Sequence, residues 1–207
     1  MDPARRTVWD FWASRYDRLW VQKHSLGPTR AMVHARIGEA APGATRFLDV
    51  GCGIGQFALE VALRRPGAEV VAVDPSRAMI DRARRDFAHP RVSHLHGFVE
   101  DVPRGDGFDV VTCQHALPYV PDAAAAVARM RDLLRPGGRV LIVHANAESA
   151  WDRFCLALVE LTTTPARYRS AAAVRALIEA AGLKPGVVRR LPAPRWFVSI
   201  HLVEGVL

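Results

Sequence analysis

The sequence predicts an α/β fold in which a mostly parallel β-sheet lies between two layers of helices. Short apolar runs, each long enough for one buried strand, alternate along the chain with stretches of helical periodicity. A glycine-rich turn joins the first of these runs to the next helix, and the second run ends on an acidic residue. Parallel strands joined by helices bring such turns and acids to one edge of the sheet, where open α/β sheets bind ligands.

The central stretch covers residues 46–59 and reads RFLDVGCGIGQFAL. Its first half is the apolar run of a strand that is covered on both faces. Gly51, Gly53 and Gly55 then occupy alternate positions, so the turn can be sharp and a ligand can approach the backbone closely. A helix that begins near Phe57 would direct its free amide groups and positive dipole end at that ligand. This arrangement is typical of a site for the adenosine part of a cofactor.

The second buried strand, over residues 69–74, ends at Asp74, which lies 19 positions after Gly55. An acid at about this spacing binds ribose hydroxyls in dinucleotide folds. Asp74 could instead only cap the next helix, since the run 74–76 also resembles an N-cap, but the upstream glycine turn favours the ribose role. Gln56 stands where a dinucleotide fingerprint needs its third glycine, which disfavours NAD.

The remaining elements continue the alternation. Strands are expected over residues 92–96, 107–113, 139–143, 187–188 and 197–203, and helices over residues 8–20, 29–41, 57–65, 78–87, 123–134, 151–161 and 170–181. Without internal repeats or a linker, we expect one domain over residues 1–207. It divides into an N-terminal helical lid or cap (1–42), a cofactor-binding core (43–145), and C-terminal helices with closing strands (146–207).

The composition is that of a soluble globular protein, with 50% hydrophobic and 24% charged residues among 207. No apolar run approaches the ~20 residues of a membrane helix, so we expect no membrane span and a cytoplasmic location. The three cysteines are widely separated, and no metal site is expected. The net charge of +7 comes from arginines spread along the chain, which favours a solvated basic surface over a nucleic-acid-binding face.

The run 49–55, DVGCGIG, resembles the first motif of class I S-adenosylmethionine-dependent methyltransferases. Further motifs of that family follow in the expected order: VDPS at 73–76, a partial match GFVEDVP at 97–103, FDVV at 108–111 and LLRPGGR at 133–139. The run 12–17, WASRYD, is similar to the N-terminal helix of small-molecule methyltransferases in the quinone-methylating group.

This resemblance implies a Rossmann-like three-layer α/β/α sandwich with extra N-terminal helices. Its seven-stranded, mostly parallel sheet would have an antiparallel last strand. The resemblance also implies S-adenosyl-L-methionine as the cofactor and in-line transfer of its methyl group to a small acceptor, for which alignment and exclusion of water matter most. The aromatic first helix and the apolar helix over residues 151–161 suggest that this acceptor is hydrophobic.

The resemblance carries the predicted cofactor-binding residues, which are Tyr16, Asp49, Gly51, Cys52, Gly53, Gly55, Asp74, Pro75, Met79, Val99, Glu100 and Gln114. By this resemblance, Tyr16 contacts the carboxylate of the cofactor and Asp49 lies near its amino acid moiety. Met79 would pack on the adenine, although it could equally be ordinary core. Phe98 replaces the usual aspartate of the family, so adenine recognition would depend on the backbone at Val99 and on stacking.

Candidates for the substrate pocket are Trp12, His115 and Tyr119. His115 is the best placed of the potential general bases because it follows the fourth strand at its carboxyl end. The other potential bases are His24, Tyr119, His144 and Glu148, and no catalytic residue is assigned.

Two alternatives stay open: an RNA or protein methyltransferase that uses the basic surface, and a non-catalytic module that binds S-adenosylmethionine.

Overall fold

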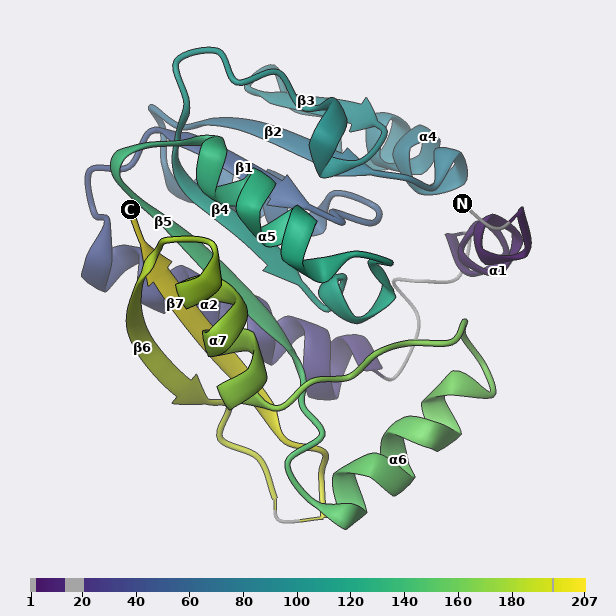
Figure 1. Ribbon diagram of the computed structural model, residues 1–207. Helices are drawn as coiled ribbons and strands as arrows, with labels where there is room; N and C mark the ends of the chain where they lie inside the picture. Colours follow the sequence, from purple (N-terminus) through teal and green to yellow (C-terminus); the bar gives the residue numbers. More distant parts are fainter. Residues whose placement is uncertain (1–2, 14–20, 195) are drawn as a thin grey trace.

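The protein folds around one seven-stranded sheet (Figure 1). The structure is a computed structural model that describes residues 3–13, 21–194 and 196–207. Its strands are β1 (Arg46–Val50), β2 (Glu69–Asp74), β3 (Val92–His96), β4 (Phe108–Gln114), β5 (Leu134–Ala145), β6 (Lys184–Arg190) and β7 (Ile200–Val206). Their order across the sheet is β3-β2-β1-β4-β5-β7-β6, with β1 to β5 parallel and β7 antiparallel to both of its neighbours. The predicted fold class, including the antiparallel last strand, is confirmed.

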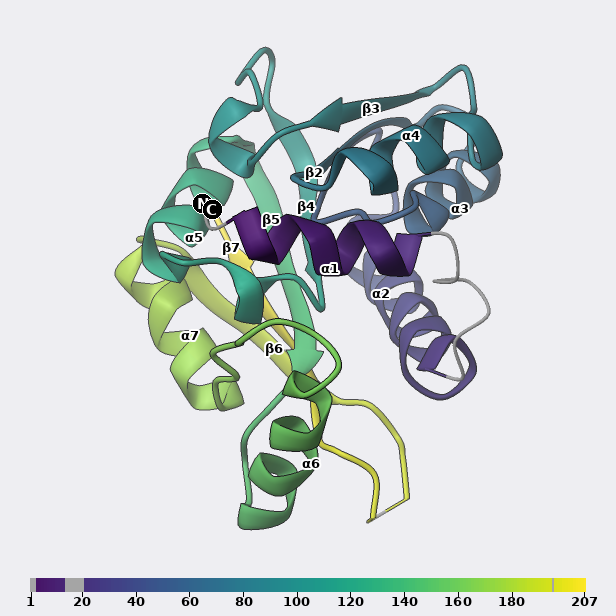
Figure 2. The same ribbon diagram turned by 90° about the vertical axis from the view of Figure 1, so that its right-hand side faces the viewer.

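Helices cover both faces of the sheet (Figures 1 and 2). One face carries α2 (Gly27–Ala40), α3 (Gln56–Arg64) and α4 (Arg77–Asp86), and the other carries α5 (Ala123–Asp132) and α7 (Ala171–Ala180). The helix α1 (Pro3–Ala13) crosses the carboxyl ends of the strands, while α6 (Ala150–Glu160) extends away from the sheet. No helix among the described residues is long and apolar enough to cross a membrane.

The central strands are buried on both faces, as their continuous apolar runs predict. In β1, Phe47 packs with α2 and α3, while the adjacent Leu48 packs with α5 and α7 on the other side. Val110 and Val111 of β4 divide between the two cores in the same way. This alternation follows from the two-residue period of a strand, and it fixes the strand ends that carry the candidate site.

Several boundaries differ from those predicted. β5 begins at Leu134, not at residue 139, because Leu134 already pairs with Phe108 before a register shift. β6 is longer than the predicted strand 187–188, and β7 begins and ends three residues later than expected. The predicted helix 8–20 is described only as far as Ala13, and residues 14–20 lie outside the described residues. The division into segments 1–42, 43–145 and 146–207 stays a prediction.

Among the described residues, three short helical turns were not predicted. They are the π-helical turn η2 (Gln22–Leu26) before α2, and the 3₁₀ turns η3 (Val99–Asp101) and η4 (Leu117–Tyr119) at the carboxyl edge of the sheet.

The glycines after β1 are required by conformation and by packing. Gly51, Gly53 and Gly55 have φ values of 71°, 55° and 83°, which L-residues with a side chain rarely adopt. A Cβ atom on Gly51 would lie 2.2 Å from the Cβ of Ala116, and one on Gly55 would lie 2.7 Å from Nε2 of His94. Glycine is therefore the residue that fits best at this turn, where the loop after β4 packs against the loop after β1.

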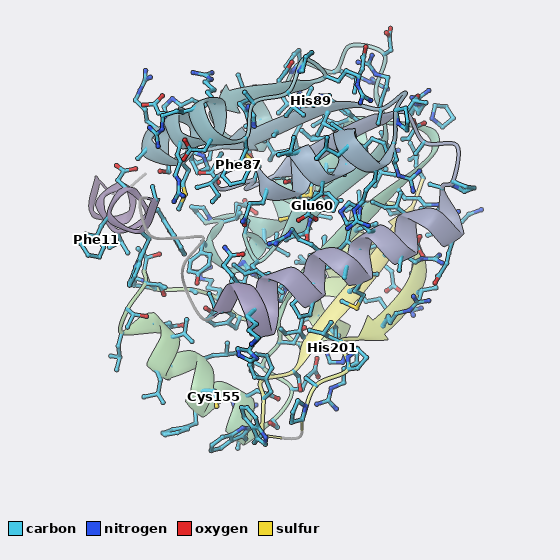
Figure 3. All side chains as sticks on the ribbon, turned by 180° about the vertical axis from the view of Figure 1, so that it is seen from behind. Phe11, Glu60, Phe87, His89, Cys155 and His201 are labelled. Atoms are coloured by element: carbon cyan, nitrogen blue, oxygen red, sulfur yellow. The ribbon has the colours of Figure 1, made fainter. Side chains whose placement is uncertain are left out.

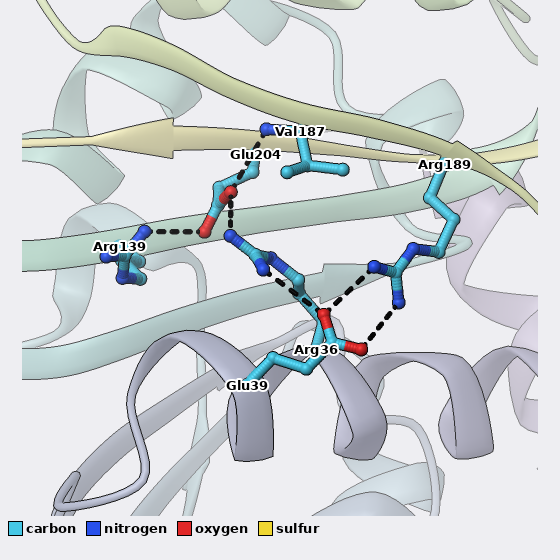
Figure 4. Close-up of polar contacts among 6 residues, drawn as sticks. All are labelled: Arg36, Glu39, Arg139, Val187, Arg189 and Glu204. Carbon is cyan, nitrogen blue, oxygen red and sulfur yellow. Dashed lines mark hydrogen bonds and ion pairs between the residues drawn. The ribbon is translucent and has the colours of Figure 1, made fainter.

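A buried carboxylate joins α2 to the last three strands (Figure 4). Glu204 of β7 is 1% exposed and accepts hydrogen bonds from Arg36 at 2.7 Å, Arg139 at 2.8 Å and the Val187 amide at 3.1 Å. Burial alone would raise the pKa of Glu204, but these three hydrogen bonds together hold it below its ordinary value. The network fixes the helical N-terminal segment to the C-terminal strands.

We expect Glu204→Gln to lower the free energy of unfolding by about 2–4 kcal/mol at pH 7. The change removes the buried carboxylate that pairs with Arg139 and one of the two carboxylates that pair with Arg36, the other being Glu39. The control is Glu179→Gln, which removes an exposed pair with Arg175 and is expected to cost less than about 0.5 kcal/mol. Because the folded pKa of Glu204 is lowered, its contribution is present above pH 4.5 and is lost as pH falls through the folded pKa. The difference between wild type and Glu204→Gln in urea unfolding should therefore shrink in acid, and a pH-independent difference would contradict this account.

Gly51→Ala should lower the free energy of unfolding by about 2–4 kcal/mol, through left-handed backbone strain and overpacking against Ala116. Gly67→Ala is the matched control, because a Cβ at Gly67 meets no atom within 4 Å. That control is expected to stay within about 0.5 kcal/mol of wild type. Equal urea midpoints for the two variants would show that the turn can relax around a methyl group.

Candidate active site

A cavity opens at the carboxyl ends of β1, β2 and β4, under α1. Its volume is about 160 Å³, which is over ten times the volume that a cavity needs on the same measure to hold one water molecule. Its lining includes many of the residues predicted from the sequence, namely Gly51, Gly53, Asp74, Pro75, Met79, Val99, Glu100, Gln114, His115 and Tyr119. The structure therefore brings together residues from three separate motifs and from the loop after β4, while their roles stay predictions.

A second, smaller cavity lies beside the first and shares four lining residues with it, Gly51, Gly53, Gln114 and His115. The predicted residues Asp49 and Cys52 line this second cavity. Arg30 of α2 also lines it and donates a 2.9 Å hydrogen bond to Glu60 of α3, which is labelled in Figure 3. Arg30 is a cation that could hold a carboxylate, and sequence reasoning missed it because it belongs to no motif.

Asp74 is fixed by two backbone amides at the end of β2. One carboxylate oxygen accepts from Gly53 at 2.9 Å and the other accepts from Ser76 at 2.9 Å. Burial raises the pKa of Asp74 to about 6, against the lowering effect of these two hydrogen bonds. Each oxygen keeps a second lone pair, so this carboxylate can also accept hydrogen bonds from a ligand in the cavity.

Asp49 is the second buried acid of the site. Burial raises its pKa to about 7, although a 2.7 Å hydrogen bond from Thr112 opposes this, and the charge of Asp74 adds to the rise. A raised folded pKa means that the folded state binds more protons, so these carboxylates make the free protein less stable as pH rises from about 4 to 7. A positively charged ligand would offset that cost.

The side chains near β3 offer flat apolar contacts. Met79 is 3% exposed and lines the cavity, as do Phe98 and Val99. The Phe98 amide donates to the carboxylate of Asp101 and is not available to a ligand. These contacts agree with adenine recognition by packing, as Phe98 in place of an aspartate predicts, and the roles of Met79 and Val99 stay predictions.

Two predicted residues among those that the structure describes, Gly55 and Trp12, line neither cavity. Gly55 lies where an added Cβ would crowd Ala83 and His94, and its role in binding a cofactor stays a prediction. Trp12 donates from its indole to the carbonyl of Thr162, beyond α6, and Trp9, one turn earlier, lines the cavity in its place. The spacing of the aromatic residues does not determine which side of α1 faces the cavity. Tyr16 lies outside the described residues.

Aromatic side chains form the far wall of the cavity. The rings of Trp9 and Tyr119 meet edge to face with centroids 5.0 Å apart. The hydroxyl of Tyr119 hydrogen-bonds that of Tyr168 at 3.0 Å, and Tyr168 was not predicted. Burial raises the pKa of Tyr119 above its ordinary value, so it stays a neutral phenol.

Polar contacts hold α1 over the cavity. The hydroxyl of Ser76, which caps α4, donates to Asp10 at 2.6 Å, and Arg82 donates to the carbonyl of Ala13. These bonds fix both halves of the described helix to α4.

Gln114 and His115 line both cavities. The side-chain amide of Gln114 is buried, and neither its nitrogen nor its oxygen has a hydrogen-bond partner among the described residues. Such a group costs about 1–3 kcal/mol unless a ligand pairs with it. Burial lowers the pKa of His115 to about 3, with smaller contributions from His144 and Arg30. His115 is therefore neutral and a poor general base near pH 7.

Comparison with known proteins identifies relatives that share these motifs. Residues 47–138 match the family described as "Methyltransferase domain". The ubiquinone biosynthesis O-methyltransferase of Xanthomonas campestris pv. campestris is 37% identical over 165 residues, which cover 74% of this chain and 66% of that protein. The enzyme of the same name from Alkalilimnicola ehrlichii is 35% identical over 70% of this chain and 63% of its own length. This chain thus spans about two thirds or less of the length of these relatives.

Solved structures share the whole fold. The magnesium protoporphyrin IX methyltransferase of Synechocystis PCC 6803 with bound SAH superposes with a TM-score of 0.70 at 19% identity, covering 97% of this chain and 98% of that one. The N-methyltransferase NodS of Bradyrhizobium japonicum, in complex with S-adenosyl-L-homocysteine, superposes with a TM-score of 0.74 at 16% identity. The match covers 98% of this chain and 97% of that one. With the motifs, the sheet order and the sequence relatives in agreement, the chain belongs to the class I S-adenosylmethionine-dependent methyltransferases and is similar to the quinone-methylating group.

Proposed function

We propose that this protein transfers a methyl group from S-adenosyl-L-methionine to a small, hydrophobic acceptor by in-line displacement. The observation that carries the proposal is the buried carboxylate of Asp74, which faces one cavity together with the glycine turn after β1. The bound cofactor would supply an activated methyl group on a cationic sulfur. The chain then has to bind the cofactor, align the acceptor and exclude water.

Each part of the site has a suitable role in this proposal. Asp74 would accept from the ribose hydroxyls, and the apolar surface of Met79 and Phe98 would hold the adenine. The smaller cavity, between the acid Asp49 and the cation Arg30, fits a moiety that carries both an ammonium and a carboxylate group. The unpaired amide of Gln114 lies between these two parts and would gain partners from the cofactor.

The rest of the larger cavity is mainly apolar. Trp9, Ala116, Tyr119, Val120 and Pro121 line it, which supports a hydrophobic acceptor. The names of the sequence relatives, ubiquinone biosynthesis O-methyltransferases, favour oxygen as the methylated atom. A small molecule as the substrate and a cytoplasmic location remain parts of the proposal.

Binding of S-adenosylmethionine by isothermal titration calorimetry tests the proposal directly. Micromolar binding followed by methylation of small phenols would support it. No binding would leave a protein with the fold but without the reaction, whereas turnover only on RNA or protein, with steep salt dependence, would favour the other acceptor classes.

Asp74→Asn should weaken S-adenosylmethionine binding by about 10–100-fold, which corresponds to the loss of charge-assisted hydrogen bonds. Glu69→Gln, at the exposed start of the same strand, is the matched control and should leave affinity unchanged. Circular dichroism and melting temperature would establish that both variants fold. Equal affinities for the two folded variants would remove Asp74 from the cofactor site.

Binding of the cationic cofactor should release protons near pH 6.5, because a cation lowers the raised pKa values of Asp49 and Asp74, about 7 and 6 in the free protein. Affinity should therefore increase from pH 5.5 to 7.5, by at most about tenfold per pH unit for each proton released. Calorimetry in buffers of different ionisation enthalpy measures the proton count directly. Asp49→Asn should reduce that count and the exposed control Asp81→Asn should not, while buffer-independent heats for wild type would contradict the assignment.

A further inference from the structure

His115 has an unusual backbone conformation at the junction of the two cavities. Of the residues that the structure describes, it is the one non-glycine with a positive φ, at 57°. Its amide donates to the carbonyl of Val143 at 2.6 Å, and the next residue, Ala116, packs against Gly51. Left-handed backbone at a non-glycine residue is costly and is found where the surrounding structure imposes it, often at functional sites.

The imidazole of His115 has one polar partner among the described residues. Its Nε2 lies 3.1 Å from the hydroxyl of Thr29, which is fully buried in the first turn of α2. No other described residue hydrogen-bonds the Thr29 hydroxyl or the Nδ1 atom of His115. Nδ1 is not enclosed by the protein, so it is open to the cavities that His115 lines.

Hydrogen-bond accounting selects one tautomer of this neutral ring. If Nε2 carried the proton and donated to Thr29, the threonine hydroxyl hydrogen would be buried without an acceptor. If Thr29 donates to Nε2 instead, every buried hydrogen is satisfied and only oxygen lone pairs lack partners, which costs less. The proton of the ring then resides on Nδ1, which is open to the cavities.

We propose that Thr29 is a positioning residue that fixes His115 as the Nδ1–H tautomer, so that His115 donates a hydrogen bond to an oxygen of the methyl acceptor. This inference rests on the proposed function and names the acceptor as an acidic hydroxyl compound, such as a phenol. The acceptor hydroxyl loses its proton to solvent, and the donated hydrogen bond favours the resulting oxyanion. As the carbon–oxygen bond forms, the bond from the methyl carbon to the sulfonium breaks and leaves a neutral thioether.

The electrostatic surroundings of His115 favour a role as a hydrogen-bond donor and disfavour a role as a general base. Burial is the main cause that lowers the pKa of His115, and His144 and Arg30 add to its effect, so the ring keeps a single proton through the physiological range. A ring that cannot accept a second proton still donates the one it has. Its donation is directed by the strained turn on one side and by Thr29 on the other.

The first experiment reads the tautomer without any acceptor. Nitrogen-15 NMR of the full chain, free and with S-adenosylhomocysteine, should show Nδ1 of His115 protonated and Nε2 unprotonated from pH 5.5 to 8. Thr29→Val removes the hydroxyl with little change of shape and should shift the ring toward a mixture of tautomers. Thr29→Ser restores a hydroxyl and should recover the wild-type spectrum. A protonated Nε2 in wild type, or identical spectra for all three proteins, would overturn the proposal.

The second experiment uses 4-nitrocatechol, whose ionisation is visible by absorbance, with protein saturated by S-adenosylhomocysteine. The pKa of the bound probe should be about one unit lower in wild type and Thr29→Ser than in Thr29→Val, a roughly tenfold change in its ionisation constant. His115→Asn keeps an N–H donor near the Nδ1 position and tolerates left-handed φ, so it should retain more of this shift than His115→Ala.

Cofactor affinity separates this proposal from the proposed function. S-adenosylhomocysteine should bind equally well to wild type, Thr29→Val and Thr29→Ser. A loss of that affinity in Thr29→Val with no change in the probe would show that His115 serves the cofactor, which overturns the proposal. Failure of S-adenosylhomocysteine to bind wild type would refute the proposed function, while the spectrum of the free protein would still decide the tautomer.

Discussion

The hydrogen bond from the Gly53 amide to Asp74 joins the two strand ends on which the whole site depends. It spans the loop after β1 and the end of β2, and it forms because positive φ at Gly53 turns the amide toward the neighbouring strand. The same carboxylate receives the Ser76 amide and so also sets the start of α4. One acid thereby positions the glycine turn, a helix and the wall of the cavity.

The two buried acids of the candidate site favour a positively charged ligand. Asp49 and Asp74 are both buried, and their raised pKa values show that neither negative charge is well compensated by the chain alone. Such groups are tolerated where a ligand completes their environment. In contrast, Glu204 is equally enclosed but has a lowered pKa, because three donors from Arg36, Arg139 and Val187 already surround it. The first two acids line the candidate site, and the third joins α2 to the last three strands.

The sequence predicts this fold well because the central strands and turns have strong local signals. The apolar run before Gly51 and the acid that ends β2 both agree with the structure. The antiparallel last strand, which the family resemblance implied, agrees as well. The closing strand β6 was predicted too short, since as an edge strand it is half exposed and lacks an apolar pattern. Leu134 was missed as the start of β5 because the turn sequence around it resembles a break.

The candidate site is less accessible to sequence reasoning. Arg30 of α2 lines the smaller cavity, while Thr29 of α2 and Tyr168 hydrogen-bond the lining residues His115 and Tyr119. All three lie in segments without a recognisable motif, and only the packing of α2 on the sheet brings the first two close. Trp9, not Trp12, lines the cavity because the orientation of α1 is set by its contacts with α4, through Asp10 and Ser76. Local sequence patterns therefore predict the residues at the strand ends, whereas the residues that α1, α2 and the loop after α6 contribute depend on tertiary packing.

The contact between Gly51 and Ala116 also limits how this protein can diversify. Because the two loops interlock with no room for another methyl group, a bulkier residue at position 116 would displace the cofactor turn itself. New acceptor preferences should therefore arise farther along the chain, at Tyr119, Thr164 and Tyr168, where substitutions reshape the far wall and leave the turn intact. The contact between these two loops thus separates the positions that can vary from those that cannot.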